Sequence, residues 1–187
     1  MRYPASHKLQ TRRRIVAMAS LRFRAEGLAQ VGIANLMADL GLTHGGFYAH
    51  FASKEALIAA ACGEALEQMN RHWRQQLADS RDGGCLAALA GQYLSPAHRD
   101  FCDSGCLTAA LAGELARQGP EVRQRFTDGL QPMLDTLDEA RRRDGTGPAP
   151  LVGLALMVGA LLLARTVSDS GLSQRILDEA RAALLDG

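Results

Sequence analysis

The chain has 187 residues, 47% of them apolar, which is long enough for a head of about 50 residues and a helical core of about 130. Its formal net charge of +1 hides an uneven distribution: residues 1–54 hold eight Lys and Arg against two acids, or +6, and residues 55–187 hold 13 against 18, or −5. A basic end suited to a polyanion is therefore joined to a mildly acidic remainder.

Two classes of protein are excluded by the apolar pattern. No N-terminal run has the charge and cleavage features of a signal peptide. The longest strongly apolar segment, Leu151–Ala164, has 14 residues, short of the roughly 20 that span a bilayer. A soluble, cytoplasmic protein that does not act at a membrane is expected.

The first predicted element is an apolar helix that follows a basic cluster. The cluster Lys8–Arg14 holds four basic side chains, and apolar residues recur behind it at helical spacing, namely Ile15, Met18, Ala19 and Phe23. The arginines of this cluster can reach a sugar-phosphate backbone or an adjacent minor groove. A basic run is more ordinarily a solvated helix face, and the segment that follows decides between the two interpretations.

A helix-turn-helix is expected next. Apolar residues recur at helical spacing in a short segment: Ile33, Leu36, Met37 and Leu40. Gly41 ends this helix, since glycine adopts the left-handed cap without a Cβ penalty. Thr43 follows as the N-cap of a second helix over roughly residues 43–49. Two short helices joined by a tight turn containing glycine form the unit that lays its second helix in the major groove of DNA.

The second helix and the residues after it carry groups suited to DNA. Gly45 and Gly46 cost roughly 1 kcal/mol each of helix propensity, which makes sense if the backbone must approach DNA closely. Tyr48 and His50 have hydrogen-bonding tips suited to phosphate oxygens. Lys54 lies in the first turn of the following helix, where its ammonium and free backbone N–H groups can together hold a phosphate.

The order Tyr48, His50, Phe51, Lys54 and Glu55 resembles the signature of TetR-type one-component transcriptional regulators, whose recognition helix ends in Tyr-x-His-Phe before a Lys-Glu pair. Gly32 replaces the family's usual hydroxyl residue as N-cap of the preceding helix. The resemblance implies an all-α fold, with a helix-turn-helix head at 1–54 and a helical effector-binding and dimerisation bundle at 55–187. It also assigns the DNA contacts, to Arg12, Arg13, Thr43, His44, Gly45, Tyr48, His50 and Lys54.

Helical periodicity continues through nearly all of the chain after Lys54, and β-branched runs are scarce. Helices are expected near residues 53–80, 84–94, 105–117, 120–143, 150–167 and 173–185. Pro96 marks a break between two of them. Pro132 is expected to kink the long helix that contains it or to split it near Leu130.

The segment before the last helix carries a wide apolar face with small residues that permit close approach. Its large members are Leu151, Leu154, Met157, Val158, Leu161 and Leu162, and its small members are Gly153, Ala155, Gly159 and Ala160. A buried helix of a monomer would have the same pattern. The family resemblance favours a homodimer interface built from this helix and the last one.

Four cysteines in an unsecreted chain are expected to be reduced. Cys62 and Cys85 are interpreted as small apolar residues of helices. Cys102 and Cys106 flank a Ser-Gly break at the start of a helix, where free N–H groups favour a thiolate, and His98 lies four residues before Cys102. This arrangement resembles a subset of TetR-type regulators whose thiol senses oxidants or electrophiles, although an inert buried cysteine is the alternative. His98, Cys102 and Cys106 would offer a metal only three ligands, and the helix that carries them is broken, so no metal site is predicted.

These features predict a repressor, the sign usual in the family, that binds a palindromic operator in double-stranded DNA as a homodimer. A small-molecule effector of unknown identity would release it, with no cofactor. The candidate effector-binding or sensing residues are Cys106, Cys102, Trp73, Tyr93 and Phe126, with Phe101 as a further aromatic.

Three other functions are weighed against this one. A sensor repressor would respond to electrophiles or oxidants through Cys106. A helical thiol enzyme would use Cys106 as nucleophile and His98 as base, but the chain has no phosphate-binding glycine loop, Cys-x-x-Cys or His-Glu-x-x-His, so an enzyme is disfavoured. An architectural DNA-binding protein would not need an acidic bundle more than twice the size of the head.

Overall fold

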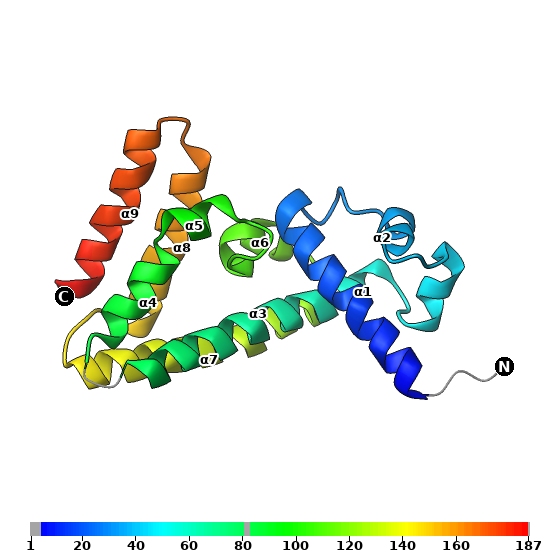
Figure 1. Ribbon diagram of the computed structural model, residues 1–187, viewed down its shortest axis with the longest axis horizontal. Coiled ribbons are helices and arrows are strands. Elements are labelled where there is room, and N and C mark those ends of the chain that lie inside the picture. Colours follow the sequence, from blue (N-terminus) through cyan, green and yellow to red (C-terminus); the bar gives the residue numbers. More distant parts are fainter. Residues whose placement is uncertain (1–4, 81–82, 187) are drawn as a thin grey trace.

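The computed structural model describes residues 5–80 and 83–186, and every regular element within these ranges is a helix. The elements are α1 (Ala5–Glu26), α2 (Ile33–Asp39), the 3-10 helix η1 (His44–Ala49), α3 (Lys54–Asp79), α4 (Cys85–Tyr93), α5 (Pro96–Asp100), α6 (Leu107–Leu115), α7 (Pro120–Asp144), α8 (Pro150–Thr166) and α9 (Ser170–Leu185). Figure 1 shows an elongated molecule with α1 and α2 at one end and α9 at the other. The all-α class expected from the sequence is confirmed.

The head consists of α1, α2 and η1, whose apolar side chains pack together. Large side chains from all three elements are fully buried there, namely Ile15, Phe23, Leu36, Met37 and Phe47. Burial of one such side chain stabilises the fold by about 1.5–3 kcal/mol. These side chains belong to a single apolar cluster that continues into the body.

The long helix α3 joins the head to the body. Its N-terminal part packs against α1, and along its length it lies beside α7 (Figure 1). A Cβ at Gly129 on α7 would lie 2.6 Å from the Leu66 side chain, so glycine is what allows the two helices to approach this closely. Asn70 of α3 donates its amide to the Gly129 carbonyl at 2.9 Å. The two helices thus form a tightly packed spine.

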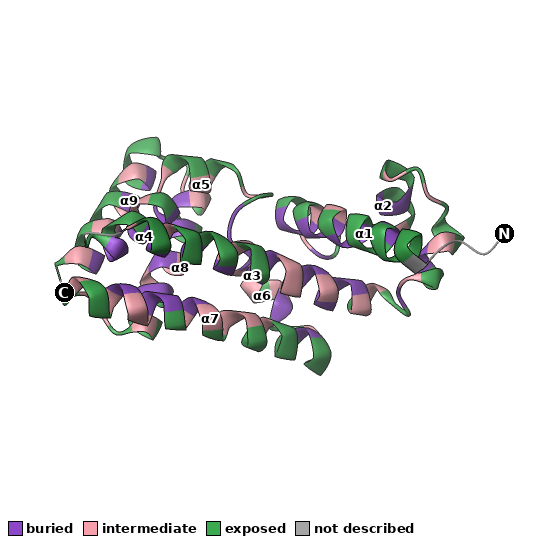
Figure 2. Cartoon of the chain, turned by 60° about the horizontal axis from the view of Figure 1, so that its bottom comes forward, coloured by how far each residue is buried: buried purple, intermediate pink, exposed green. Residues whose placement is uncertain are grey.

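The remaining helices complete the body around this spine. α8 lies against α9, and α6 lies against both α1 and α8. Figure 2 shows that the side of α7 facing α3 is buried while its outer side is exposed. No helix of the described residues is both long enough and apolar enough to cross a membrane.

Two helices differ from the sequence-based expectation. The break at Pro96 is confirmed, since α4 ends at Tyr93, but Pro96 also opens the unexpected short helix α5. Proline suits the first helical turn, and the Ser95 hydroxyl caps this helix by accepting from the N–H of His98. α7 is one continuous helix through Pro132, so the expected split near Leu130 is wrong. Packing of the following turns against the core outweighs the backbone bond that proline removes.

The apolar face expected on α8 is divided between two surroundings. Leu154, Met157 and Leu161 are buried in the body's own core, so assigning them to a dimer interface is wrong. The opposite side of α8 exposes four large apolar side chains, which we name the α8 stripe: Leu151, Val152, Leu162 and Leu163. One side of α8 therefore packs in the core of the body, and the opposite side is exposed.

Candidate nucleic-acid interface and effector cavity

Two caps shape the turn between α2 and η1. Gly41 has φ +69°, and its N–H donates to the Ala38 carbonyl at 2.9 Å. The Thr43 hydroxyl accepts from the N–H of Gly46 at 3.2 Å. Gly41 and Thr43 thus act as predicted, as a left-handed cap and as an N-cap. They fix the direction in which η1 leaves the head.

η1 has one buried side and one exposed side. Phe47 is buried in the head core, and its ring stacks on that of Phe51 with centroids 5.5 Å apart. The exposed side carries four of the predicted DNA contacts: Thr43, His44, Gly45 and Tyr48. Tyr48 is 59% exposed. A Cβ at Gly45 would meet nothing within 4 Å, so the backbone there is open to a partner.

His50 differs from these residues because it is half-buried. Its Nδ1 is buried and has no hydrogen-bond partner among the described residues. Burial lowers the pKa of His50, and the positive charges of Lys8 and Arg12 lower it further. The imidazole is therefore neutral at physiological pH and can offer a phosphate a hydrogen bond but no charge.

The basic side chains of α1 spread over the head. The Arg12 guanidinium lies 4.5 Å from the centre of the Phe51 ring, a cation–π contact. Arg14 donates to the Leu40 carbonyl at 3.4 Å and so reaches the end of α2. Arg12 and Arg13 line an open groove of about 920 Å³ between α1, α3 and α7. Both guanidinium groups are exposed at the edge of the head.

Lys54 begins α3, immediately after η1. The Ser53 hydroxyl caps this helix by accepting from the N–H of Ala56 at 3.1 Å. Lys54 itself is half-buried in the first turn. An anion at this helix end would therefore meet an ammonium group together with free backbone N–H groups.

The head is tied to the body through α6 and the loop before it, residues 101–106. Arg24 is buried near the end of α1, and its Nε donates to the Asp103 carbonyl at 2.5 Å. Burial lowers the pKa of Arg24, while the Asp103 carboxylate acts in the opposite direction. The N–H of Leu28 donates to the Glu114 carboxylate of α6 at 2.9 Å. The sequence shows no sign of these contacts, because the partners are 79 and 86 residues apart.

Cys106 is the N-cap of α6, as its helix-opening position predicted, but it is only 1% exposed. Its backbone N–H donates to Nε2 of His98 at 2.8 Å, and Nδ1 of His98 lies 2.7 Å from the Tyr93 carbonyl. These bonds require a neutral imidazole with its proton on Nδ1. Burial lowers the pKa of His98, which favours that form. Neither ring nitrogen is available to the Cys106 thiol, so the expected role of His98 as its base is wrong.

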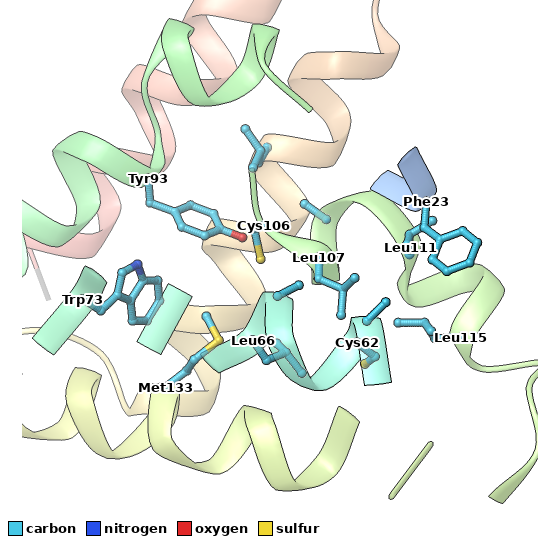
Figure 3. Packing of buried hydrophobic residues seen from close by; sticks show 14 of the residues in the cluster. Phe23, Cys62, Leu66, Trp73, Tyr93, Cys106, Leu107, Leu111, Leu115 and Met133 are labelled. Atoms are coloured by element: carbon cyan, nitrogen blue, oxygen red, sulfur yellow. The ribbon is translucent and has the colours of Figure 1, made fainter. Parts of the chain in front are cut away.

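The Tyr93 hydroxyl lies beside the Cys106 thiol in the interior of the body, as Figure 3 shows. This hydroxyl is buried without a hydrogen-bond partner among the described residues. Burial raises the pKa of Tyr93 well above its ordinary value, and the neighbouring Cys106 raises it further. The Cys106 sulfur is closed off from solvent, because α6 and Tyr93 enclose it.

The other cysteines are separate from this pair. The thiol of Cys102 is half-buried and contacts the Arg99 carbonyl at 3.7 Å, and all four cysteines are free. Cys62 and Cys85 are buried in helices as expected, and burial raises the pKa of Cys62 to about 12. No group of His, Cys, Asp and Glu within the described ranges is arranged to hold a metal ion.

A cavity of about 390 Å³ opens between α3, α4, α5 and the loop before α6. We name it the aromatic cavity; its lining residues are Met69, His72, Trp73, Gln92, Tyr93, Ser95, Ala97, His98, Phe101, Ser104 and Gly105. It brings together two predicted effector residues, Trp73 and Tyr93, whose rings pack edge to face at 5.8 Å. Phe126 lines a separate cavity of about 460 Å³ between α6 and α7. Cys102 and Cys106 are not among the lining residues of either cavity.

Comparison with known proteins gives a family match for the head. The model of the bacterial regulatory proteins of the tetR family matches residues 15–61, which include most of α1, the helix-turn-helix and the start of α3. The chain is also similar to an uncharacterized HTH-type transcriptional regulator of Bacillus subtilis (strain 168), YerO, at 26% identity over 123 residues. That match covers 63% of this chain and 40% of the relative, so the chain spans well under half of the relative's length.

Solved structures resemble the chain over nearly its whole length. A TetR-family regulator from Agrobacterium tumefaciens has a TM-score of 0.79 at 18% identity, with 95% of this chain and 99% of that chain covered. The reduced form of E. coli NemR has a TM-score of 0.75 at 22% identity, covering 92% and 94%. A TetR regulator from Chloroflexus aurantiacus has a TM-score of 0.72 at 26% identity, covering 95% of each. Both head and body therefore share the architecture of these proteins.

Proposed function

The chain belongs to the TetR family of bacterial transcriptional regulators, and from that premise we propose that it is a repressor that leaves its operator when a small molecule binds in its body. Regulators of this family bind operator DNA, act as dimers and are not enzymes. The observation that carries the proposal is the exposed polar side of η1, which buried Phe47 holds in place next to the basic start of α1.

In the proposed complex each head, residues 1–54, lays η1 in a major groove. The open backbone at Gly45 lets the helix approach the DNA closely, with Thr43 and His44 at its leading end. Tyr48 and Lys54 then reach phosphate oxygens on either side of the groove. The remaining phosphate contacts come from Arg12, Arg13 and His50.

The proposed dimer forms through the α8 stripe and α9, within the effector-binding and dimerisation bundle of residues 55–187. Four large apolar side chains exposed together on one helix favour burial against a second copy. Half-buried Gly159 on the same helix permits close approach, because a Cβ there would meet nothing within 4 Å in a single chain. A two-fold axis through this surface would place two heads on two half-sites of a palindrome.

Release is proposed to pass through the loop before α6. Phe101, Ser104 and Gly105 of this loop line the aromatic cavity, and the carbonyl of Asp103 in the same loop holds Arg24 of the head. A ligand in the cavity would move the loop and with it the end of α1. The two heads would then no longer match the spacing of the half-sites.

The experiment that tests this function is a titration of the purified protein against DNA from upstream of its own coding region. We expect a palindromic fragment to be bound as one dimer, with affinity falling by orders of magnitude between about 50 and 200 mM salt, because several phosphates are neutralised in each head. A reporter placed behind that fragment should be silenced by the protein. The absence of binding at low salt would refute the assignment, and activation of the reporter would refute repression.

A second candidate function is thiol sensing through Cys106. It is favoured by the Tyr93 hydroxyl, which is buried without a partner beside this sulfur, and by the place of Cys106 at the N-terminus of α6. An α,β-unsaturated carbonyl compound that entered would add across its C=C bond: the π bond opens, the Cys106 sulfur bonds to the β-carbon and the thiol proton passes to the α-carbon. The added group would not fit between α6 and Tyr93, and would displace α6 from the head.

Mass spectrometry after a limiting dose of N-ethylmaleimide separates this candidate from release by a non-covalent ligand. A sensing thiol should react before Cys62, whose pKa of about 12 keeps it protonated, and operator affinity should fall with the extent of reaction at Cys106. The Cys106→Ser variant should bind the operator but lose the response. Equal reaction at the two thiols, or modification without loss of affinity, would leave only the non-covalent ligand.

A further inference from the structure

The aromatic cavity has a lining that is selective for one chemical class. We infer that it binds an uncharged, flat aromatic molecule that carries a hydrogen-bonding group on its edge. This inference rests on the proposed release by an effector and adds the identity of the ligand class. The volume of the aromatic cavity, about 390 Å³, lies within the range of small-molecule sites and leaves room for about two or three fused rings.

The cavity gathers most of the aromatic side chains of the body. Residues 55–187 contain only four Trp, Tyr and Phe, and three of them line this cavity: Trp73, Tyr93 and Phe101. The fourth, Phe126, lies at the separate cavity between α6 and α7. The rings of His72 and His98 complete the lining. A chain with 5% aromatic residues thus has five rings around one small space.

The rings form a floor, made by Trp73, Tyr93 and His98, and an exposed rim at Phe101. Trp73 and Tyr93 are buried and pack edge to face, and the Tyr93 and His98 rings do the same with centroids 4.6 Å apart. Phe101 lies at the rim and is 64% exposed, although a large apolar side chain favours burial. A flat ligand would offer its face or edge to the floor and would cover Phe101, since aromatic rings prefer stacked or edge-to-face contact.

None of the described residues that line the cavity is Asp, Glu, Lys or Arg. The guanidinium of Arg165 is not among the lining groups, and it donates to the carbonyls of His98 and Arg99. The bonds of His98 to the Cys106 N–H and the Tyr93 carbonyl hold that imidazole neutral. A carboxylate or ammonium group inside would lose its water, and no described lining residue offers it a carboxylate, ammonium or guanidinium partner. An uncharged ligand avoids this cost.

Polar groups at the rim fit one hydrogen-bonding substituent. The side-chain amide of Gln92 is exposed and forms no hydrogen bond with any described residue, so it can both donate and accept. The Ser95 hydroxyl already accepts from the N–H of His98 and retains its own proton for donation. A hydroxyl or carbonyl on the edge of the ligand would therefore find partners at the rim while the rings fill the floor.

Calorimetric titration of the full chain without DNA tests the ligand class separately from repression. The probes are 2-naphthol, the anion 2-naphthoate and decahydro-2-naphthol, which keeps the hydroxyl and the two fused rings but is not aromatic. We expect 2-naphthol to bind at least about tenfold more tightly than either of the others. Phe101→Ala, a change at an exposed position, should weaken 2-naphthol about tenfold, whereas Phe126→Ala at the other cavity should leave it unchanged.

Each alternative result has a defined meaning. Equal or tighter binding of 2-naphthoate would overturn the inference in favour of an anion site. Equal binding of decahydro-2-naphthol would show that the cavity selects apolar ligands but not aromatic ones. A larger effect of Phe126→Ala than of Phe101→Ala would place the ligand in the cavity between α6 and α7. Failure of every probe to bind would also overturn it. Binding of 2-naphthol with no change in operator affinity would support the ligand class while refuting the proposed release.

Discussion

The head and the body of this protein use their sequences in different ways. In the head, the helix-turn-helix is shaped by neighbours along the chain: Gly41 and Thr43 cap adjacent helices, and the exposed polar side of η1 follows within six residues. In the body, the groups that matter meet across long distances, as Arg24 of α1 meets the carbonyl of Asp103. The shape of the head's surface is therefore determined by residues that are close in sequence. The interior of the body is determined by contacts between residues that are far apart in sequence.

This difference predicts how each region responds to substitution. A change on the exposed side of η1 should alter DNA binding and leave stability nearly intact, because those side chains contribute little to the core. A change in the body should alter stability, assembly or the position of the head, because its polar groups are buried and connected. Four substitutions can contradict or sharpen this comparison, and they are ordered here by expected effect.

The largest effect is expected from a body residue far from DNA. Gly159→Glu should fold as a single chain, because space is open around the glycine, but would place a charge beside the α8 stripe. We expect a monomer in analytical ultracentrifugation and a loss of operator affinity of more than about 100-fold, since one head makes half the contacts. Gly91→Glu on α4 is the matched control, because it is also half-buried with nothing within 4 Å of its Cβ. A dimeric Gly159→Glu protein would refute the proposed interface.

Arg24→Met tests the link between the two regions. The variant keeps an unbranched side chain but loses the hydrogen bond to the Asp103 carbonyl, so we expect a decrease of about 1.5–3 kcal/mol in the free energy of unfolding. The control is Arg22→Met, which removes an ion pair with Glu26 and Asp39 on the exposed side of the same helix and should cost less than about 1 kcal/mol. Urea denaturation measures both. Equal decreases in the free energy of unfolding would mean that the buried hydrogen bond from Arg24 stabilises the protein no more than the exposed ion pair of Arg22.

Tyr48→Ala should weaken operator binding about tenfold, as expected for loss of one phosphate contact. Its side chain is largely exposed, so the urea midpoint should stay where it is in the parent protein. Tyr48→Phe separates the hydroxyl from the ring, because it removes only the hydrogen-bonding tip. An unchanged affinity in both variants would remove Tyr48 from the interface and would contradict the proposed placement of η1.

The sequence predicts the head better than the body for physical reasons. Caps at Gly41 and Thr43 depend on backbone geometry within four residues, so spacing alone locates them. The position of Cys106 as a helix-opening residue was likewise predictable. Its burial was not, since that depends on how α6 meets Tyr93 and α8. Spacing also suggested that His98 would serve a thiol, whereas the chain turns so that its ring accepts from a backbone N–H instead.

The smallest effect concerns the pH dependence of stability and the buried imidazole of His98. Burial lowers the pKa of His98 from its ordinary value of 6.5, the Tyr93 carbonyl opposes this in part, and the charges of Arg165 and His72 lower the pKa further. The unfolded chain therefore binds the proton more readily than the folded one. The stability that the neutral ring contributes is complete above pH 6.5 and is lost as the pH falls below that value.

Urea denaturation between about pH 8 and pH 5 measures this contribution. The parent protein should lose stability below pH 6.5 more steeply than His98→Gln, because protonation of the ring must also break the bond from the Cys106 N–H. His50, whose pKa is lowered as well, will leave a residual slope in that variant. His44→Gln is the matched control, because it makes the same side-chain change at an exposed position of η1. Identical slopes in the parent and His98→Gln would show that the ring is not held neutral by its two hydrogen bonds, and the argument for an uncharged aromatic cavity would lose its support at that wall.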